Sequence, residues 1–112
     1  MPKELWTIRF ETPDGDESQG VIIFDATHLY GGDGSFYYQG TYTTNAKDGT
    51  LTGQVDVVRH DPSAEFIFPS LNVGRFQITG QLTKPDTLLK AHLIQYPQHT
   101  LAITCHYVKD LA

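Results

Sequence analysis

Alternation of apolar and polar side chains constrains this chain more than any other feature of its sequence. In the segment 5–11 the apolar residues Trp6, Ile8 and Phe10 alternate with polar ones, so they share one face of an extended strand. Similar segments follow at residues 20–25, 27–30, 36–43, 50–60, 73–82, 87–95 and 100–108. No stretch of a dozen residues has a helical period. The sequence therefore predicts an all-β chain of about eight strands.

The residues between these segments predict that consecutive strands are antiparallel neighbours. All six prolines lie at a terminus or between strands, where their missing N–H is not needed for sheet pairing. Gly40, Gly53 and Gly80 lie within strands, where glycine commonly marks a bulge or a bend that lets a sheet curl closed. The predicted fold is a small up-and-down antiparallel β-barrel, and an open two-layer sandwich is the alternative.

The composition indicates one globular domain over residues 1–112. Hydrophobic residues make up 39% of the chain, enough to bury a core without a disulfide or a structural metal. The net charge is −5 with no basic cluster, so direct binding to nucleic acid is not expected. The chain has a single cysteine and no secretory signal, which predicts a cytoplasmic protein. Its longest apolar run, Val21 to Phe24, is too short for a membrane span.

Two short motifs carry a resemblance to a known family. Leu29-Tyr30-Gly31-Gly32-Asp33 is followed a few residues later by Tyr37-Tyr38-Gln39-Gly40. Around them lie an alternating segment at Trp6, the run Gly20-Val21-Ile22-Ile23 and a long segment that ends in Arg59-His60. Together these features resemble the GrlR-like family, which is named for a negative regulator of type III secretion genes in enteric bacteria.

The resemblance implies a lipocalin-like, eight-stranded barrel that forms a homodimer and is not an enzyme. The founding member of the family binds and sequesters a helix-turn-helix transcriptional activator, and its contact depends on an acidic run in one loop. The corresponding loop here is Thr44-Asn45-Ala46-Lys47-Asp48-Gly49, which contains one acid and one base. The resemblance thus implies a bacterial regulatory protein, and no partner-binding residue is carried over from this loop.

A short apolar segment is the first candidate for a contact with a partner or a second copy. Phe66, Ile67 and Phe68 lie between two predicted strands and are followed by Pro69. Three large apolar side chains in a connection are expected to be buried rather than exposed as a patch. The segment is interpreted as a plug of one barrel end, a dimer contact or a mobile lid.

The first turn is the second candidate, because it holds three carboxylates. Asp14, Asp16 and Glu17 surround Gly15. One interpretation is a solvated acidic turn. The others are a Ca²⁺ site, for which the spacing of an EF-hand is missing, and an acidic patch that steers a basic partner.

Gly31, Gly32 and Asp33 are interpreted as a structural turn. Glycine tolerates backbone conformations that other residues do not, and the Asp33 side chain is expected to cap backbone donors nearby. The alternative is a cradle of backbone N–H groups for an anion. No helix and no Lys-Ser/Thr pair follow, so this is not a phosphate loop.

The barrel interior is a further candidate site, because eight strands leave room for side chains or for one small ligand. The residues expected to point inward are Trp6, Phe10, Tyr38, Tyr42, Val55, Phe76, Ile78 and Leu101. They form either a core or, with gaps at the in-strand glycines, a modest apolar cavity. The second interpretation makes the protein a carrier or sensor of a small apolar ligand.

Signatures of catalysis and metal binding are missing from the sequence. The five histidines form no His-x-His pair or His-Glu-x-x-His run, and no serine lies in a nucleophile elbow. Cys105 shares one face of its predicted strand with Leu101 and Ile103, so it is expected to be a buried apolar residue. We therefore expect no cofactor, no metal and no enzymatic activity. The regulatory binding role is what the resemblance to the GrlR-like family implies.

Overall fold

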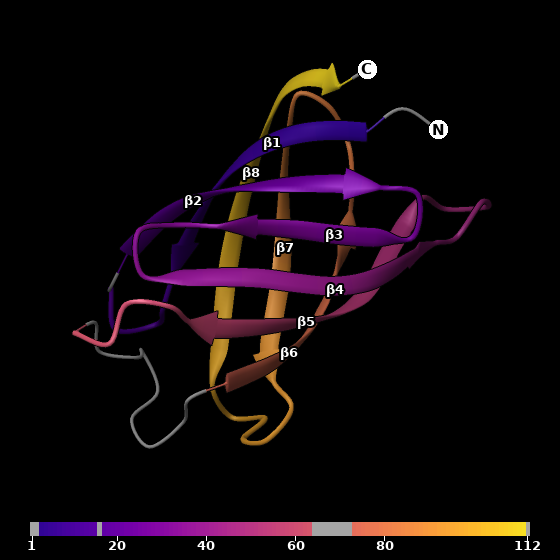
Figure 1. Ribbon diagram of the computed structural model, residues 1–112. Helices are drawn as coiled ribbons and strands as arrows, with labels where there is room; N and C mark the ends of the chain where they lie inside the picture. Colours follow the sequence, from indigo (N-terminus) through magenta and orange to yellow (C-terminus); the bar gives the residue numbers. More distant parts are fainter. Residues whose placement is uncertain (1–2, 16, 64–72, 112) are drawn as a thin grey trace.

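The computed structural model describes residues 3–15, 17–63 and 73–111, which form a closed barrel. Its strands are β1 (Lys3–Glu11), β2 (Glu17–Asp25), β3 (His28–Gly32), β4 (Phe36–Thr44), β5 (Thr50–Arg59), β6 (Val73–Gln81), β7 (Asp86–Leu93) and β8 (Thr100–Leu111). Each strand pairs with the next, and β8 returns to pair with β1 antiparallel (Figure 1). This confirms the predicted up-and-down β-barrel over the open sandwich. Within the described ranges there is no helix long and apolar enough to cross a membrane.

Two expectations about the glycines need correction. The third strand does not stop at Tyr30, because Gly31 and Gly32 continue β3 and pair with β4. The in-strand Gly40 marks no bulge, since its pairing with both neighbouring strands is regular. The register shift that does occur lies between Leu5 and Trp6, where β1 pairs with β8. The barrel thus closes with an irregularity at the seam between its first and last strands.

Alternate side chains point into the barrel and form one core. The largest fully buried side chains are Trp6, Leu29, Leu51, Leu89, Leu93 and Cys105. Aromatic rings meet edge to face inside it, with ring centroids 6.1 Å apart for Trp6 and Phe24 and 5.2 Å apart for Phe24 and Tyr42. Such pairs add about 1 kcal/mol each to the apolar burial. Seven of the eight residues expected inside are buried, and Phe10 is half-buried against the same core.

The close approach of β4 to β5 requires a glycine at position 40. A Cβ on Gly40 would overlap the carbonyl oxygen of Gln54 and would lie 2.9 Å from the Cα atom of Val55. Both obstacles are backbone atoms, which cannot move aside as a flexible side chain can. The missing side chain of Gly40 therefore lets two neighbouring strands lie closer than any other residue permits.

We expect Gly40→Ala to lower the free energy of unfolding by about 3 kcal/mol, because the added methyl group forces the two strands apart. The measurement is urea-induced unfolding followed by the fluorescence of the single tryptophan, Trp6. Gly34→Ala is the matched control. A Cβ at Gly34 meets no other atom within 4 Å, so its stability should stay within about 0.5 kcal/mol of the original chain. Equal stability of the two variants would contradict the close approach.

Candidate functional site

The barrel interior holds only a small void. An apolar cavity of about 30 Å³ lies among side chains that include Ile8, Phe24, Ile78 and Cys105. Small-molecule sites commonly enclose about 300–1,000 Å³, which is at least about ten times the volume of this void. Among the described residues the interior is therefore a packed core with little space for a ligand.

The gaps expected at the in-strand glycines are filled by their neighbours. A Cβ on Gly80 would lie 2.7 Å from Cδ2 of Leu89, and one on Gly53 would lie 2.9 Å from Cβ of Tyr42. These side chains already occupy the space that the glycines leave. The glycines thus bring strands and side chains together instead of opening a cavity.

Cys105 is fully buried in this core. Burial raises the pKa of its thiol to about 12, because the low-polarity surroundings disfavour the thiolate. Since the thiolate is the nucleophilic form, this cysteine is unreactive at neutral pH. It contributes to packing, as expected for an apolar residue at its position.

Asp33 organises the turn between β3 and β4. Its Oδ1 atom accepts hydrogen bonds from the backbone N–H groups of Ser35 and Phe36, both at 2.8 Å. Its Oδ2 atom accepts hydrogen bonds from the hydroxyl of Ser18, at 3.3 Å, and from the hydroxyl of Tyr38. The carboxylate thereby uses the N–H groups that a bound anion would need and places a negative charge beside them. This geometry is that of a structural turn, and it opposes the interpretation as an anion cradle.

Tyr38 ties this turn to the barrel core. Its ring is buried and meets the Phe10 ring edge to face, with centroids 5.3 Å apart. Burial, followed by the hydrogen bond to Asp33, raises the pKa of the Tyr38 hydroxyl far above its usual value. His60 adds a link, because its Nε2 atom lies 3.0 Å from the carbonyl oxygen of Asp33, an atom that only accepts hydrogen bonds. The turn is thus fixed from both β4 and the end of β5.

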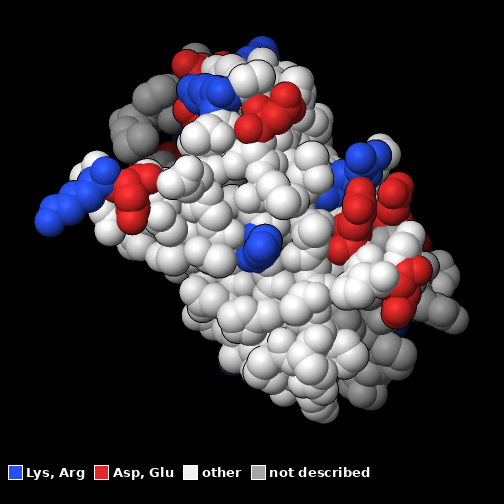
Figure 2. Space-filling view, turned by 180° about the vertical axis from the view of Figure 1, so that it is seen from behind, with Lys and Arg blue, Asp and Glu red and all other residues white. Residues whose placement is uncertain are grey.

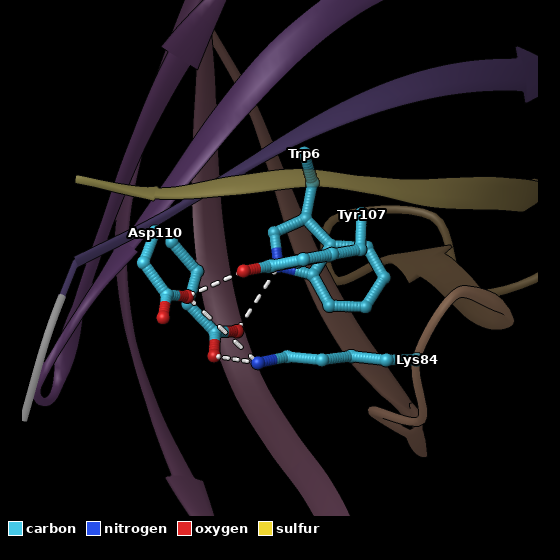
Figure 3. Close-up of polar contacts among 5 residues, drawn as sticks. Trp6, Lys84, Tyr107 and Asp110 are labelled. Carbon is cyan, nitrogen blue, oxygen red and sulfur yellow. Dashed lines mark hydrogen bonds and ion pairs between the residues drawn. The ribbon is translucent and has the colours of Figure 1, made fainter.

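A second polar cluster lies toward the opposite end of the barrel (Figure 3). Lys84, in the turn between β6 and β7, places its Nζ atom 2.7 Å from Oε2 of Glu4 and 3.9 Å from Oδ1 of Asp110. The same atom lies 4.3 Å from the centre of the Tyr107 ring, and the Tyr107 hydroxyl donates a 2.6 Å hydrogen bond to Asp110. The Trp6 indole N–H donates to Glu4 at 3.2 Å. The cluster therefore links the first strand, the last strand and the turn between β6 and β7.

This cluster is suited to structure rather than to proton transfer. The hydrogen bond to Glu4 raises the pKa of the Lys84 ammonium, and the hydrogen bond to Asp110 raises the pKa of the Tyr107 hydroxyl. Lys84 therefore stays charged and Tyr107 stays neutral at physiological pH. A catalytic base needs a pKa near the working pH, and both groups are shifted away from it.

The acidic first turn is only partly described. Asp14 and Glu17 are exposed to solvent, while Asp16 lies outside the described residues. Where the chain is described, no group of three or more His, Cys, Asp or Glu side chains is placed to hold a metal ion. The carboxylates that are seen thus form a solvated edge of the barrel.

The apolar segment with Phe66, Ile67 and Phe68 also lies outside the described residues. Its three interpretations, a plug, a dimer contact and a lid, therefore stay predictions.

An apolar patch on the outer surface was not foreseen from the sequence. Val21, Tyr30 and Tyr37 are 44%, 46% and 42% exposed. Strand pairing brings them together, because Val21 lies opposite Gly32, which lies opposite Tyr37, and Ile23 lies opposite Tyr30. We define the outer apolar patch by its members, which are Val21, Ile23, Tyr30, Tyr37 and Val58. The run Val21 to Phe24 could have indicated this patch. In a strand that is apolar at every position, Val21 and Ile23 must face outward when Ile22 and Phe24 face the core.

Other exposed apolar side chains are dispersed. Leu88 and Val108 lie toward one end of β7 and β8, and Ile94 and Tyr96 lie beyond the other end of β7. Figure 2 shows the molecule from behind, where uncharged residues cover much of the surface and charged residues of both signs lie mainly in the upper part of the view. The outer apolar patch differs because its members are neighbours across adjacent strands.

The chain matches no protein-family model and no curated protein. The resemblance to the GrlR-like family rests on the residues quoted for it above.

We expect Asp33→Ala to lower the free energy of unfolding by about 3 kcal/mol, because four donors lose their acceptor together. Tyr38→Phe removes one of these donors and should cost about 1 kcal/mol. Guanidinium-induced unfolding of both variants and of the double variant measures the two losses and their coupling. A smaller loss for Asp33→Ala than for Tyr38→Phe would contradict the capping role of the carboxylate.

Proposed function

We propose that this chain is a non-enzymatic regulatory protein that binds a partner protein through the outer surface of its barrel. The outer apolar patch is the observation that carries this proposal. Its three most exposed members are large side chains in adjacent strands, and contiguous exposed apolar surface is typical of interaction sites. Tyrosine suits such a surface, because it offers a large apolar area and a hydroxyl for hydrogen bonding.

The small interior void supports binding at the surface over carriage of a ligand. A cavity of about 30 Å³ has no room for the apolar compound that a carrier would enclose. The exterior, in contrast, offers apolar side chains that nothing in the described structure covers. Of the two functions that the sequence left open, the geometry therefore favours protein binding.

The proposed activity is the sequestration of a transcriptional activator, as the resemblance to GrlR-like negative regulators implies. Tyr30 and Tyr37 belong to the two motifs that carry this resemblance, and the structure places both on the outer side of the β3–β4 hairpin. On β2, Glu17 and Asp25 flank the patch at its two ends. Oδ2 of Asp25 lies 4.0 Å from Nζ of Lys3, so its charge is partly compensated. Glu17 and the net charge of −5 favour the approach of a basic partner and affect the association rate more than the affinity.

We expect a tagged form of the chain to retain a helix-turn-helix activator, in roughly equal amount, from a lysate of its own host. The double variant Val21→Ser, Tyr37→Ser should lose this protein, because it removes two apolar contacts from the patch. The control is Leu88→Ser, Val108→Ser, which changes two equally exposed apolar residues elsewhere on the barrel. Mass spectrometry of the retained proteins gives the result. Recovery of the bait alone, or equal recovery by both double variants, would contradict the proposal.

We also propose that the chain forms a homodimer, which the resemblance implies. Analytical ultracentrifugation should give the mass of two chains at micromolar concentration, and a monomer there would refute the dimer. The same patch variant locates the contact. If Val21→Ser, Tyr37→Ser yields a monomer while the control variant stays dimeric, the outer apolar patch is the dimer contact and the activator must bind elsewhere.

A further inference from the structure

A groove on the outer surface is much larger than the void inside the barrel. It has a volume of about 370 Å³ and crosses β4 and β5 on their outward side. This volume lies within the range of roughly 300–1,000 Å³ found for small-molecule sites. The groove is an open depression rather than an enclosed pocket, and among the described residues it offers room for a ligand that the interior lacks.

Two cross-strand rows of outward-facing residues line the groove. The first row is Tyr30, Gln39, Asp56 and Arg75, each opposite the next in the strand pairing. The second row is His28, Thr41 and Gln54, paired in the same way. Because successive rows on one face of a sheet are two residues apart, the rows lie side by side. The groove is thus built on regular strands, which fix the backbone positions from which its side chains project.

One wall of the groove is aromatic. The rings of His28 and Tyr30 lie 5° from parallel with their centroids 6.2 Å apart. Both side chains are exposed, so part of this aromatic surface is available to a ligand. An aromatic ring offers an apolar surface with a negative face, against which weakly positive C–H groups pack well.

The opposite wall carries an ion pair, whose two charges compensate each other. The Nε atom of Arg75 lies 3.7 Å from Oδ1 of Asp56. Carboxylate acceptors and guanidinium donors are thereby side by side with no net charge. Between the walls, the amides of Gln39 and Gln54 each offer both donors and an acceptor, and the Thr41 hydroxyl offers one of each.

We propose that this groove binds a neutral saccharide. A sugar ring has an apolar C–H face that suits the aromatic wall and neighbouring hydroxyls that donate and accept at once. Adjacent hydroxyls match the side-by-side carboxylate and guanidinium, and the amides of the floor. An anionic ligand would be repelled by Asp56 and a cationic ligand by Arg75. The paired charges therefore favour neither kind of ligand over a neutral one. An apolar ligand would strip water from these polar groups without replacing its hydrogen bonds. This proposal does not rest on the partner protein proposed above, although both sites include Tyr30.

The test is a titration of the ¹⁵N-labelled protein, observed by NMR, with maltose, cellobiose and lactose as neutral probes. Galacturonate is the anionic comparison and glucosamine the cationic one. At least one neutral disaccharide should cause saturable shifts of the groove amides below about 50 mM, a concentration at which even a millimolar site is filled. Absence of saturable shifts with all three, or tighter binding of a charged sugar, would overturn the proposal.

Matched variants locate the site. Gln54→Ala should weaken binding about fivefold and Asp56→Ala about tenfold or more, because the latter removes a charged acceptor. Gln19→Ala changes an exposed glutamine on β2, outside the groove, and should leave the affinity unchanged. A well-dispersed spectrum shows that each variant is folded. If folded Gln54→Ala and Asp56→Ala bind as well as the original chain, the saccharide lies elsewhere and the proposal fails.

Discussion

Pairing between β1 and β8 is the contact on which the rest of this structure depends. It joins the two ends of the described chain and leaves the barrel with no open sheet edge (Figure 1). The charged and aromatic cluster of Lys84 lies across this closure, because Lys84 reaches Glu4 on β1 and Asp110 on β8. A single exposed ion pair contributes little to stability. This cluster can contribute more, because one ammonium group contacts carboxylates on both strands of the closure. The buried Trp6 ring then packs beneath Tyr107 at the same seam.

Closure also separates the two faces of every strand and thereby limits where function can lie. A closed barrel of eight strands has an interior that its own side chains nearly fill. Here Cys105 is buried and protonated, and Tyr38 is held neutral by burial and by Asp33. The inward face thus supplies stability. The outward face carries the exposed side chains, among them those of the outer apolar patch and of the groove.

The number of strands and their inward residues could be predicted from alternation, since one parity of each strand must be apolar to form a core. The ends of the strands could not, because Gly31 and Gly32 carry no side chain to show that they continue β3. Asp33 was also foreseen as a local cap, because Asp in a glycine-rich turn commonly accepts nearby N–H groups. The outer sites were not foreseen. Tyr30, Asp56 and Arg75 lie far apart in the sequence, and only the register across β3, β4, β5 and β6 makes them neighbours. Each register is set by the hydrophobic pattern and by the turn between two strands, and all three pairings must be right together before these residues become neighbours.

The two proposed surface sites meet at Tyr30, which belongs to the outer apolar patch and to the aromatic wall of the groove. A partner protein seated on the patch would cover this ring and remove one wall of the groove. A saccharide stacked on the ring would in turn obstruct the partner. Linkage requires that each ligand weaken the other by the same factor. Because Val21 and Tyr37 lie outside the groove and Gln54 lies outside the patch, variants at these positions separate the two sites and leave Tyr30 as their shared element.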